Sequence, residues 1–224
     1  MTRSFAGRTF VFRTGPRSID DGSTFASDLA FLLESGVRPI VVAPTARDAR
    51  AHVRTLNRRT NVAVGLCGAD AALLPAAGTD VGRVQTGILI TLTAAGYIPV
   101  IEPTGYGLGA REIEISPDAV ASAVAAATDA ARAIFFHDAG GVTDPQSRTL
   151  LAELTPAEAL ALADGDALDP DLRAIVRAAA SGVRAGVPAA QIIDGRISHA
   201  AIVELLTKQH LGTQVTGAVY LGAA

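Results

Sequence analysis

Two kinds of segment alternate along most of the chain, and this alternation constrains the fold more than any other feature. A short run rich in β-branched residues is followed by an amphipathic segment rich in Ala and Leu, and the pair recurs many times. Such alternation is typical of a mainly parallel sheet with crossover helices. The expected strands are residues 9–13, 38–43, 61–65, 97–102, 133–137, 190–193 and 213–216. The expected helices are approximately residues 22–35, 46–59, 87–95, 117–130, 156–164, 170–184 and 199–206.

Local signals support these boundaries. Ser116-Pro117 and Thr155-Pro156 each place a capping hydroxyl before a first-turn proline, as helix starts favour. Three helices are expected to end at a left-handed glycine, namely Gly36, Gly96 and Gly186. Residues 104–115 predict an antiparallel hairpin on the sheet edge.

Size and composition indicate one folded α/β domain, residues 1–224. Of the 224 residues, 49% are hydrophobic and 18% are charged, which is far from the composition of disordered chains. The formal net charge is −3, so the chain shows no basic surface for nucleic acid or an anionic membrane. We expect neither partner.

Cysteine and hydropathy patterns predict a soluble, cytoplasmic protein. The single cysteine, Cys67, cannot form an internal disulfide, and it is expected to be structural. The first residues lack a signal-peptide core, and no apolar run approaches the ~18 residues of a membrane span. Four scattered histidines give no metal-ligand spacing, so no metal site is expected.

Lysine is nearly absent from the chain. Lys208 is the only lysine among 19 basic residues, and the others are arginines. Any chemistry that needs two lysines in one site is therefore excluded.

Several segments resemble acetylglutamate kinases of the amino acid kinase family. The most specific is the run Gly186-Val187-Pro188-Ala189-Ala190-Gln191-Ile192-Ile193-Asp194-Gly195-Arg196-Ile197-Ser198-His199-Ala200. Further matches occur in the expected order at residues 63–70, 96–101, 115–118, 137–142, 204–207 and 211–213. The resemblance covers roughly residues 50–216, whereas the first 45 residues match only in pattern.

The resemblance implies a three-layer αβα sandwich with two functional halves. The N-terminal half, about residues 1–115, would bind a carboxylate substrate at its strand ends. The C-terminal half, about residues 116–224, would bind ATP and magnesium there. Family members transfer the γ-phosphoryl group to the carboxylate, using glycine-rich turns and two lysines that neutralise phosphate charge.

The chain departs from this family pattern at each cationic and glycine-rich position. Arg13 stands where the family has its first lysine, and a planar guanidinium does not replace a compact ammonium at a tight phosphate site. Counting back from Gly186 puts Ile175 at the second lysine. The turn after the second strand contains Pro44 and Thr45 and no glycine. A long family segment that carries the substrate lid and a dimerisation helix is nearly all missing between residues 46 and 56.

Other positions match family sites and define our candidates. Asp138 matches the aspartate that orients the two lysines, and we expect it to pair with Arg13. These two residues are the catalytic candidates, although Arg13 is alternatively a structural partner alone. His137 is either a proton-transfer group or an exposed histidine without a role. The substrate-binding candidates are Gly15, Thr45, Ser116 and Asp118, and the nucleotide-binding candidates are Gly141 and His137.

Two functional classes follow from this pattern. The first is a pseudokinase that binds a small molecule and acts as a regulatory or scaffolding subunit. We expect such a protein to work beside a partner enzyme and to form a homodimer. The second is an active carboxylate kinase, or another biosynthetic enzyme, with a remodelled site. ATP and magnesium are implied by the resemblance alone.

Overall fold

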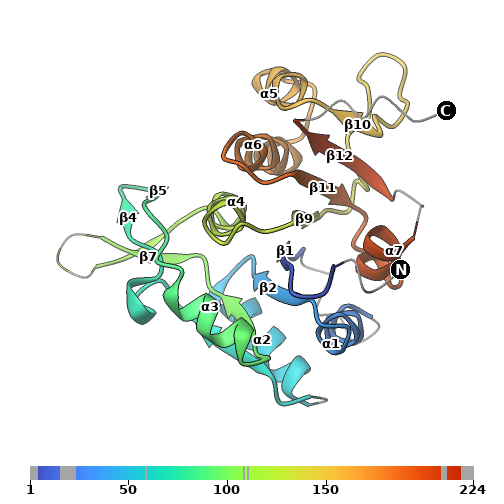
Figure 1. Cartoon of the computed structure of the whole chain (residues 1–224). Helices are drawn as coiled ribbons and strands as arrows, with labels where there is room; N and C mark the ends of the chain where they lie inside the picture. Colours follow the sequence, from blue (N-terminus) through green and yellow to red (C-terminus); the bar gives the residue numbers. More distant parts are fainter. Residues whose placement is uncertain are drawn as a thin grey trace.

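An eight-stranded sheet with the order β10-β12-β11-β9-β1-β2-β6-β3 runs through the computed structural model (Figure 1). The structure describes residues 5–15, 24–58, 60–107, 109, 111–207 and 211–217. The strands of this sheet are β1 (Thr9–Arg13), β2 (Arg38–Val42), β3 (Ala63–Leu66), β6 (Ile98–Ile101), β9 (Arg132–Phe136), β10 (Glu153–Leu154), β11 (Ala189–Ile193) and β12 (Gly212–Thr216). All neighbouring pairs are parallel except β11 and β12, which are antiparallel. The expected mainly parallel α/β sheet is confirmed.

Helices cover both faces of the sheet. One face carries α1 (Phe25–Glu34), α2 (Ala46–Asn57) and α7 (Ala200–Leu206), and the other carries α3 (Gly87–Ala94), α4 (Pro117–Ala127), α5 (Pro156–Asp164) and α6 (Pro170–Arg184). Successive residues of a strand point to opposite faces. Phe10 and Phe12 accordingly pack with α1, while Val11 between them belongs to the core under α4 and α6. The result is the expected three-layer αβα sandwich.

The predicted boundaries agree closely with the observed elements. Strand β1 and helices α5 and α6 begin and end at the predicted residues. Thr155 and Glu158 form the predicted capping box on α5. Gly36, Gly96 and Gly186 all have positive φ after their helices.

The predicted hairpin is correct in pairing and wrong in place. β7 (Thr104–Tyr106) and β8 (Glu112–Glu114) pair antiparallel, but they form a separate two-stranded sheet and do not join the edge of the main sheet. A further small hairpin, β4 (Ala76–Ala77) with β5 (Asp80–Val81), lies next to it and was not predicted. β4 and β5 have two residues each, which is too short for a hydrophobic period to be recognised.

The structure also bears on membrane insertion. Within the described residues, no helix is long and apolar enough to cross a bilayer.

Candidate functional site

The candidate residues gather where β1 lies between its two neighbours. β1 pairs with β2 of the N-terminal half on one side and with β9 of the C-terminal half on the other. The three strands are parallel, so their carboxyl ends lie at one edge of the sheet, where open α/β sheets bind ligands. Arg13 ends β1, and His137 and Asp138 directly follow β9.

Arg13 forms a buried ion pair with Asp118. Arg13 Nε lies 2.6 Å from Asp118 Oδ1, and the two side chains are only 13% and 8% exposed. Neither atom has a hydrogen bond of good geometry, so the contact is electrostatic. Asp118 is in the first turn of α4, which packs against β1. Burial raises the pKa of Asp118, and the charge of Arg13 opposes that rise.

This pair corrects the expectation that Arg13 would bind Asp138. Asp138 lies in the exposed loop after β9, whereas α4 brings the carboxylate of Asp118 underneath the guanidinium. Asp138 interacts electrostatically with Arg196, whose own guanidinium pairs with Asp194 at 2.7 Å. The charge of His137 also opposes the rise in the pKa of Asp118, so His137 lies within electrostatic range of the Arg13–Asp118 pair.

Next to Arg13, a buried histidine holds the end of β1. Thr14 is fully buried, and its Oγ1 lies 3.0 Å from Nε2 of His52 on α2. Burial lowers the pKa of His52 to about 4, partly opposed by the charge of Asp48. His52 was missed by the sequence analysis. Its spacing from Ala49 and Leu56, which are also buried, is the signal that places it on the inner face of α2.

Gly15 and Thr45, two of the predicted substrate-binding residues, lie in the segments that follow β1 and β2. A Cβ on Gly15 would lie 3.1 Å from the carbonyl oxygen of Phe136, so the loop after β1 passes close to the end of β9. The hydroxyl of Thr45 caps α2, accepting a bond from the Asp48 N–H at 3.1 Å and donating to Asp48 Oδ2 at 2.7 Å. Thr45 is thus used in starting the helix.

Gly141 and His137 make local contacts in the loop after β9. Gly141 has φ +135°, and a Cβ there would lie 2.9 Å from Thr213 Oγ1 of β12. Thr213 Oγ1 in turn accepts the Val142 N–H at 2.7 Å. The glycine is therefore required for packing this loop on the sheet. His137 Nδ1 accepts the Ala139 N–H at 3.1 Å, which leaves Nε2 as the nitrogen that can carry the proton.

A cavity of about 640 Å³ lies between α4 and α6. Its walls are mostly small residues of the two helices, and Ser116, the predicted substrate-binding residue, is at its rim together with Asp80 of β5. Ser116 also caps α4 by accepting the Ala119 N–H. The cavity has the size and apolar lining of a small-molecule site.

The two arginines of this cavity bond to backbone carbonyls in α5 and in the loop that follows it. Arg173 Nη2 donates to the Leu168 carbonyl at 3.0 Å, and Arg177 Nη2 donates to the Ala163 carbonyl at 2.8 Å. Ile175, between them in sequence, is 0% exposed and belongs to the hydrophobic core. One turn of helix holds 3.6 residues, so Arg173 and Arg177 point away from the direction of Ile175.

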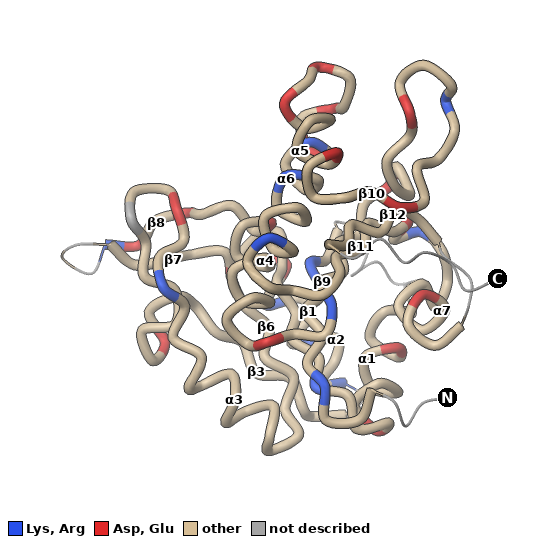
Figure 2. The backbone as a smooth tube through the Cα atoms, turned by 45° about the horizontal axis from the view of Figure 1, so that its top comes forward, with Lys and Arg blue, Asp and Glu red and all other residues tan. Residues whose placement is uncertain are grey.

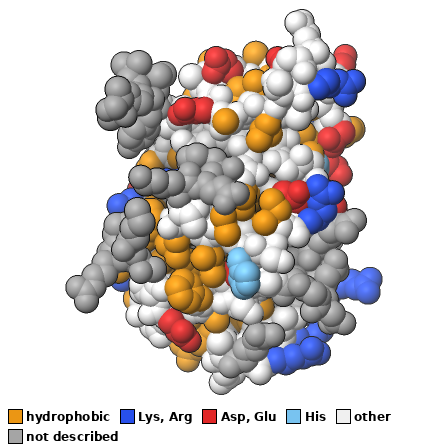
Figure 3. Space-filling model, turned by 90° about the vertical axis from the view of Figure 1, so that its right-hand side faces the viewer, with side chains coloured by type: hydrophobic (Ala, Val, Ile, Leu, Met, Phe, Trp, Pro, Cys, Tyr) orange, Lys and Arg blue, Asp and Glu red, His pale blue; other side chains and the backbone are white. Residues whose placement is uncertain are grey.

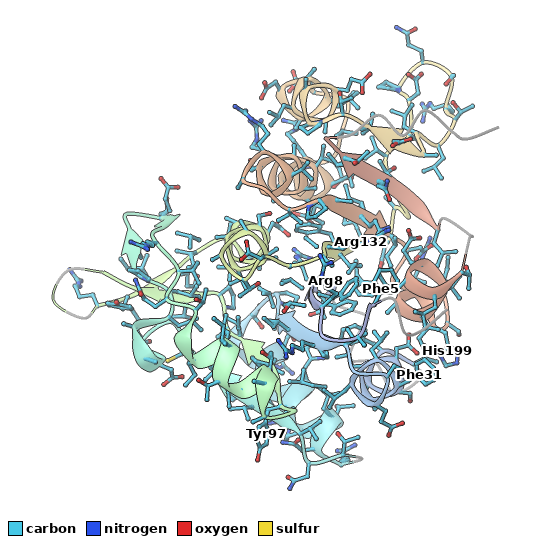
Figure 4. All side chains as sticks on the ribbon, viewed as in Figure 1. Phe5, Arg8, Phe31, Tyr97, Arg132 and His199 are labelled. Carbon is cyan, nitrogen blue, oxygen red and sulfur yellow. The ribbon has the colours of Figure 1, made fainter. Side chains whose placement is uncertain are left out.

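On the opposite face of the sheet, α1 and α7 are joined by His199. Its Nδ1 lies 2.7 Å from Oδ1 of Asp28, and its backbone N–H donates to Thr24 Oγ1 at 2.6 Å. Figure 4 shows the labelled side chain of His199 on the α7 side of this junction and that of Phe31 on α1. Figure 3 shows hydrophobic side chains gathered around a histidine on this face of the molecule.

No group of three or more His, Cys, Asp or Glu side chains suited to hold a metal ion occurs in the part of the chain that the structure describes.

Comparison with known proteins identifies relatives of the whole chain. An acetylglutamate kinase of Trichlorobacter lovleyi is 28% identical over 274 aligned residues, which cover 96% of this chain and 94% of the relative. That aligned length exceeds the 224 residues of this chain, so the relative carries segments that this chain lacks.

Solved structures agree on the fold. An N-acetylglutamate synthase from Neisseria gonorrhoeae, solved with coenzyme A and N-acetyl-glutamate, superposes with a TM-score of 0.82 at 19% identity and covers 98% of this chain. This chain spans 62% of the length of that protein. A carbamate kinase from Giardia lamblia bound to AMP-PNP gives a TM-score of 0.72 at 12% identity, covering 97% of this chain and all of the other.

A family model supplies the assignment. The model of the amino acid kinase family matches residues 46–194, which is more than half of the sequence. The chain belongs to the amino acid kinase family.

Proposed function

We propose that this protein is a pseudokinase of the acetylglutamate kinase type, which binds a small molecule and has lost phosphoryl transfer. The observation that carries the proposal is which residues occupy the two positions where the resemblance places lysines, and what those residues contact. Arg13 has its charge balanced by Asp118 at 2.6 Å, and Ile175 is an uncharged residue in the core. The remaining lysine, Lys208, lies outside the described residues.

The chemistry of phosphoryl transfer explains why these positions matter. The reaction is mostly positioning and neutralisation of the charge that develops on the phosphoryl oxygens. The charge of a guanidinium that is already paired with a buried carboxylate is largely compensated, so it stabilises phosphoryl oxygens only weakly. Each 1.4 kcal/mol of lost transition-state stabilisation costs about tenfold in rate, so the loss of two cations removes many orders of magnitude.

The turn after β2 also does not fit a bound triphosphate. Pro44 lacks a backbone N–H, and the Thr45 hydroxyl is used to cap α2. No glycine lets the backbone approach phosphate oxygens in this turn. We therefore derive no catalytic step through ATP and magnesium for this chain.

The 640 Å³ cavity between α4 and α6 is the proposed ligand site. Ser116, the residue that caps α4, lines it together with residues along α4 and α6. Calorimetric titration with ATP–magnesium tests the proposal. Ala178→Phe places a larger side chain in the cavity and shows whether any heat that is observed comes from this site. We expect no heat with ATP at millimolar concentration. Micromolar ATP binding would contradict the loss of the nucleotide site.

The alternative is an active carboxylate kinase, and one observation favours it. Arg13 keeps a cation at the carboxyl end of β1, near His137 and at the same sheet edge as Asp138. A partner protein could supply the second cation, as arginine fingers do. Phosphorylated product from the purified chain, abolished by Asp138→Asn, would establish this alternative.

We further propose that the protein is cytoplasmic and forms a homodimer, and that it works beside a partner enzyme. The exposed Phe31 of α1 and Ile197 before α7 are candidate contacts between copies, since they are 44% and 39% exposed. Sedimentation velocity of the wild type and of Phe31→Ser tests this. A monomer at all concentrations would contradict the homodimer.

A further inference from the structure

A second cavity lies at the far edge of the sheet, away from Arg13 and Asp118. It has a volume of about 450 Å³ and is formed by α2, by the carboxyl ends of β3 and β6, and by the segment after β3. Figure 2 shows α2 next to β3 and β6 in this part of the molecule. Its charged and reactive lining residues are Arg50, Arg54, Cys67, Asp70 and Glu102.

The backbone leaves this space open for two reasons. β3 is an edge strand, so no further strand covers it. Gly65 on β3 has no side chain, and a Cβ there would already touch Val53 of α2 at 3.4 Å. The floor of the cavity is apolar, because Ala49, Val53 and Leu66 line it.

Two arginines stand together on the rim. Arg50 and Arg54 are four residues apart on α2, so they project from the same side of the helix. The side chain of Arg50 is 62% exposed and touches Glu102 only at 3.6 Å. Arg54 makes no side-chain hydrogen bond or ion pair with any residue that the structure describes. Both guanidinium groups are therefore available to an anion.

Two carboxylates line the same cavity. Glu102, at the end of β6, is only 20% exposed, and its one ion pair among the described residues is the long contact with Arg50. Asp70 uses Oδ2 to accept the Cys67 N–H at 2.7 Å and keeps its other oxygen. The cavity thus combines two positive and two negative groups around an apolar floor.

We propose that this cavity binds a free α-amino acid. Its carboxylate would pair with Arg54 and Arg50, its ammonium group with Glu102, and its side chain would lie on Ala49, Val53 and Leu66. The lining carries both signs of charge, so a ligand with a single charge would pair with only one of them, whereas a zwitterion pairs with both. A volume of 450 Å³ is in the range of small-molecule sites. The inference does not depend on the loss of phosphoryl transfer.

The single cysteine of the chain provides a direct test. Cys67 lines the cavity and is the only thiol, so the rate of its reaction with a chromogenic disulfide reports on this site alone. The full-length protein is treated with the reagent in the presence of each proteinogenic amino acid in turn. We expect at least one amino acid to slow the reaction, and calorimetry with the same amino acids provides a second readout should the thiol react too slowly.

Single-charge analogues and matched variants separate the proposal from nonspecific effects. The amine and the carboxylic acid that correspond to the protecting amino acid should not protect Cys67. Arg54→Gln and Glu102→Gln should each weaken binding by about tenfold, the loss of one charge-assisted hydrogen bond. Arg58→Gln, at the residue directly after α2, should have no effect, and melting temperatures should show that all variants are folded.

Three results would overturn the proposal. One is that no amino acid protects Cys67 or produces heat. The second is that the carboxylic acid alone protects as well as the amino acid, which would make this a simple anion site. The third is unchanged binding in folded Arg54→Gln and Glu102→Gln. Each of these results leaves the proposed loss of kinase activity untouched.

Discussion

Asp118 and Arg13 join the first turn of α4 to the last residue of β1 through an ion pair of 2.6 Å. Breaking a buried pair by removing one partner leaves the other charge uncompensated. We expect Asp118→Leu, with the buried guanidinium left alone, to lower the free energy of unfolding by about 3 kcal/mol or more. Urea unfolding of the purified variant measures this.

The double variant distinguishes the charge effect from a packing defect. Arg13→Met combined with Asp118→Leu removes both charges and keeps apolar volume, and such replacements are often neutral. We expect the double variant to be more stable than Asp118→Leu alone. Equal stability of the two would show that the pair contributes no coupling.

His52 should make the protein less stable in mild acid. Its pKa is about 4 in the folded state, below the ordinary value of 6.5, so the unfolded chain binds more protons between those values. Stability contributed by the neutral histidine is therefore complete above about pH 6.5 and is lost as the pH falls toward 4, by about 3 kcal/mol in total. Urea unfolding across this pH range measures the slope.

A histidine-free control isolates this effect. His52→Gln offers an uncharged amide to Thr14 and does not titrate, so its stability should depend less on pH between 4 and 6.5 than that of the wild type. Identical pH profiles for the two proteins would rule out His52 as the source of acid sensitivity.

Restoring a lysine at position 175 should harm the fold without restoring a site. Ile175 is fully buried, and an ammonium group there would be moved out of water without a partner. We expect Ile175→Lys to lower the free energy of unfolding by about 3 kcal/mol or more. Ile175→Val is the matched control, with an expected cost of about 1 kcal/mol. A well-folded Ile175→Lys protein that gains phosphoryl transfer would refute this view of the position.

The contact between His199 and Asp28 should hold α7 against α1. Burial raises the pKa of Asp28, and the hydrogen bond to His199 opposes that rise, so the carboxylate depends on this partner. We expect His199→Ala to cost about 1–3 kcal/mol and to speed amide hydrogen exchange in α7. Ser198→Ala, the neighbouring substitution, is the control. Unchanged exchange in α7 would mean that apolar packing alone holds the helix.

Most of the sheet and its helices could be predicted from the sequence, because the hydrophobic residues of these segments recur with the period of a strand or of a helix over five or more residues. α6 is an example, since Asp169-Pro170 marks its start and Gly186 its end. The separate β7–β8 sheet could not be placed, because its position depends on tertiary contacts such as the bridge between Pro75 and Tyr106.

The sequence identified candidate site residues but not their contacts. Arg13 lies at the sheet edge that β9 and His137 share, as parallel strands place it, but its contact with Asp118 was not predicted. The predicted partner of Arg13, Asp138, was wrong. Counting residues along the sequence cannot tell whether Asp118 or Asp138 lies next to the guanidinium in space. His52 was missed because its importance comes from burial against Thr14, a residue 38 positions away.

The most direct test of the proposed loss of kinase activity is to trap acyl phosphate. The purified chain is incubated with ATP, magnesium, hydroxylamine and N-acetyl-L-glutamate or other small carboxylates, and hydroxamate is quantified. We predict no hydroxamate above the level without protein, with Asp138→Asn the same as wild type. Hydroxamate that forms in proportion to protein and disappears in Asp138→Asn would contradict the proposal and establish an active kinase.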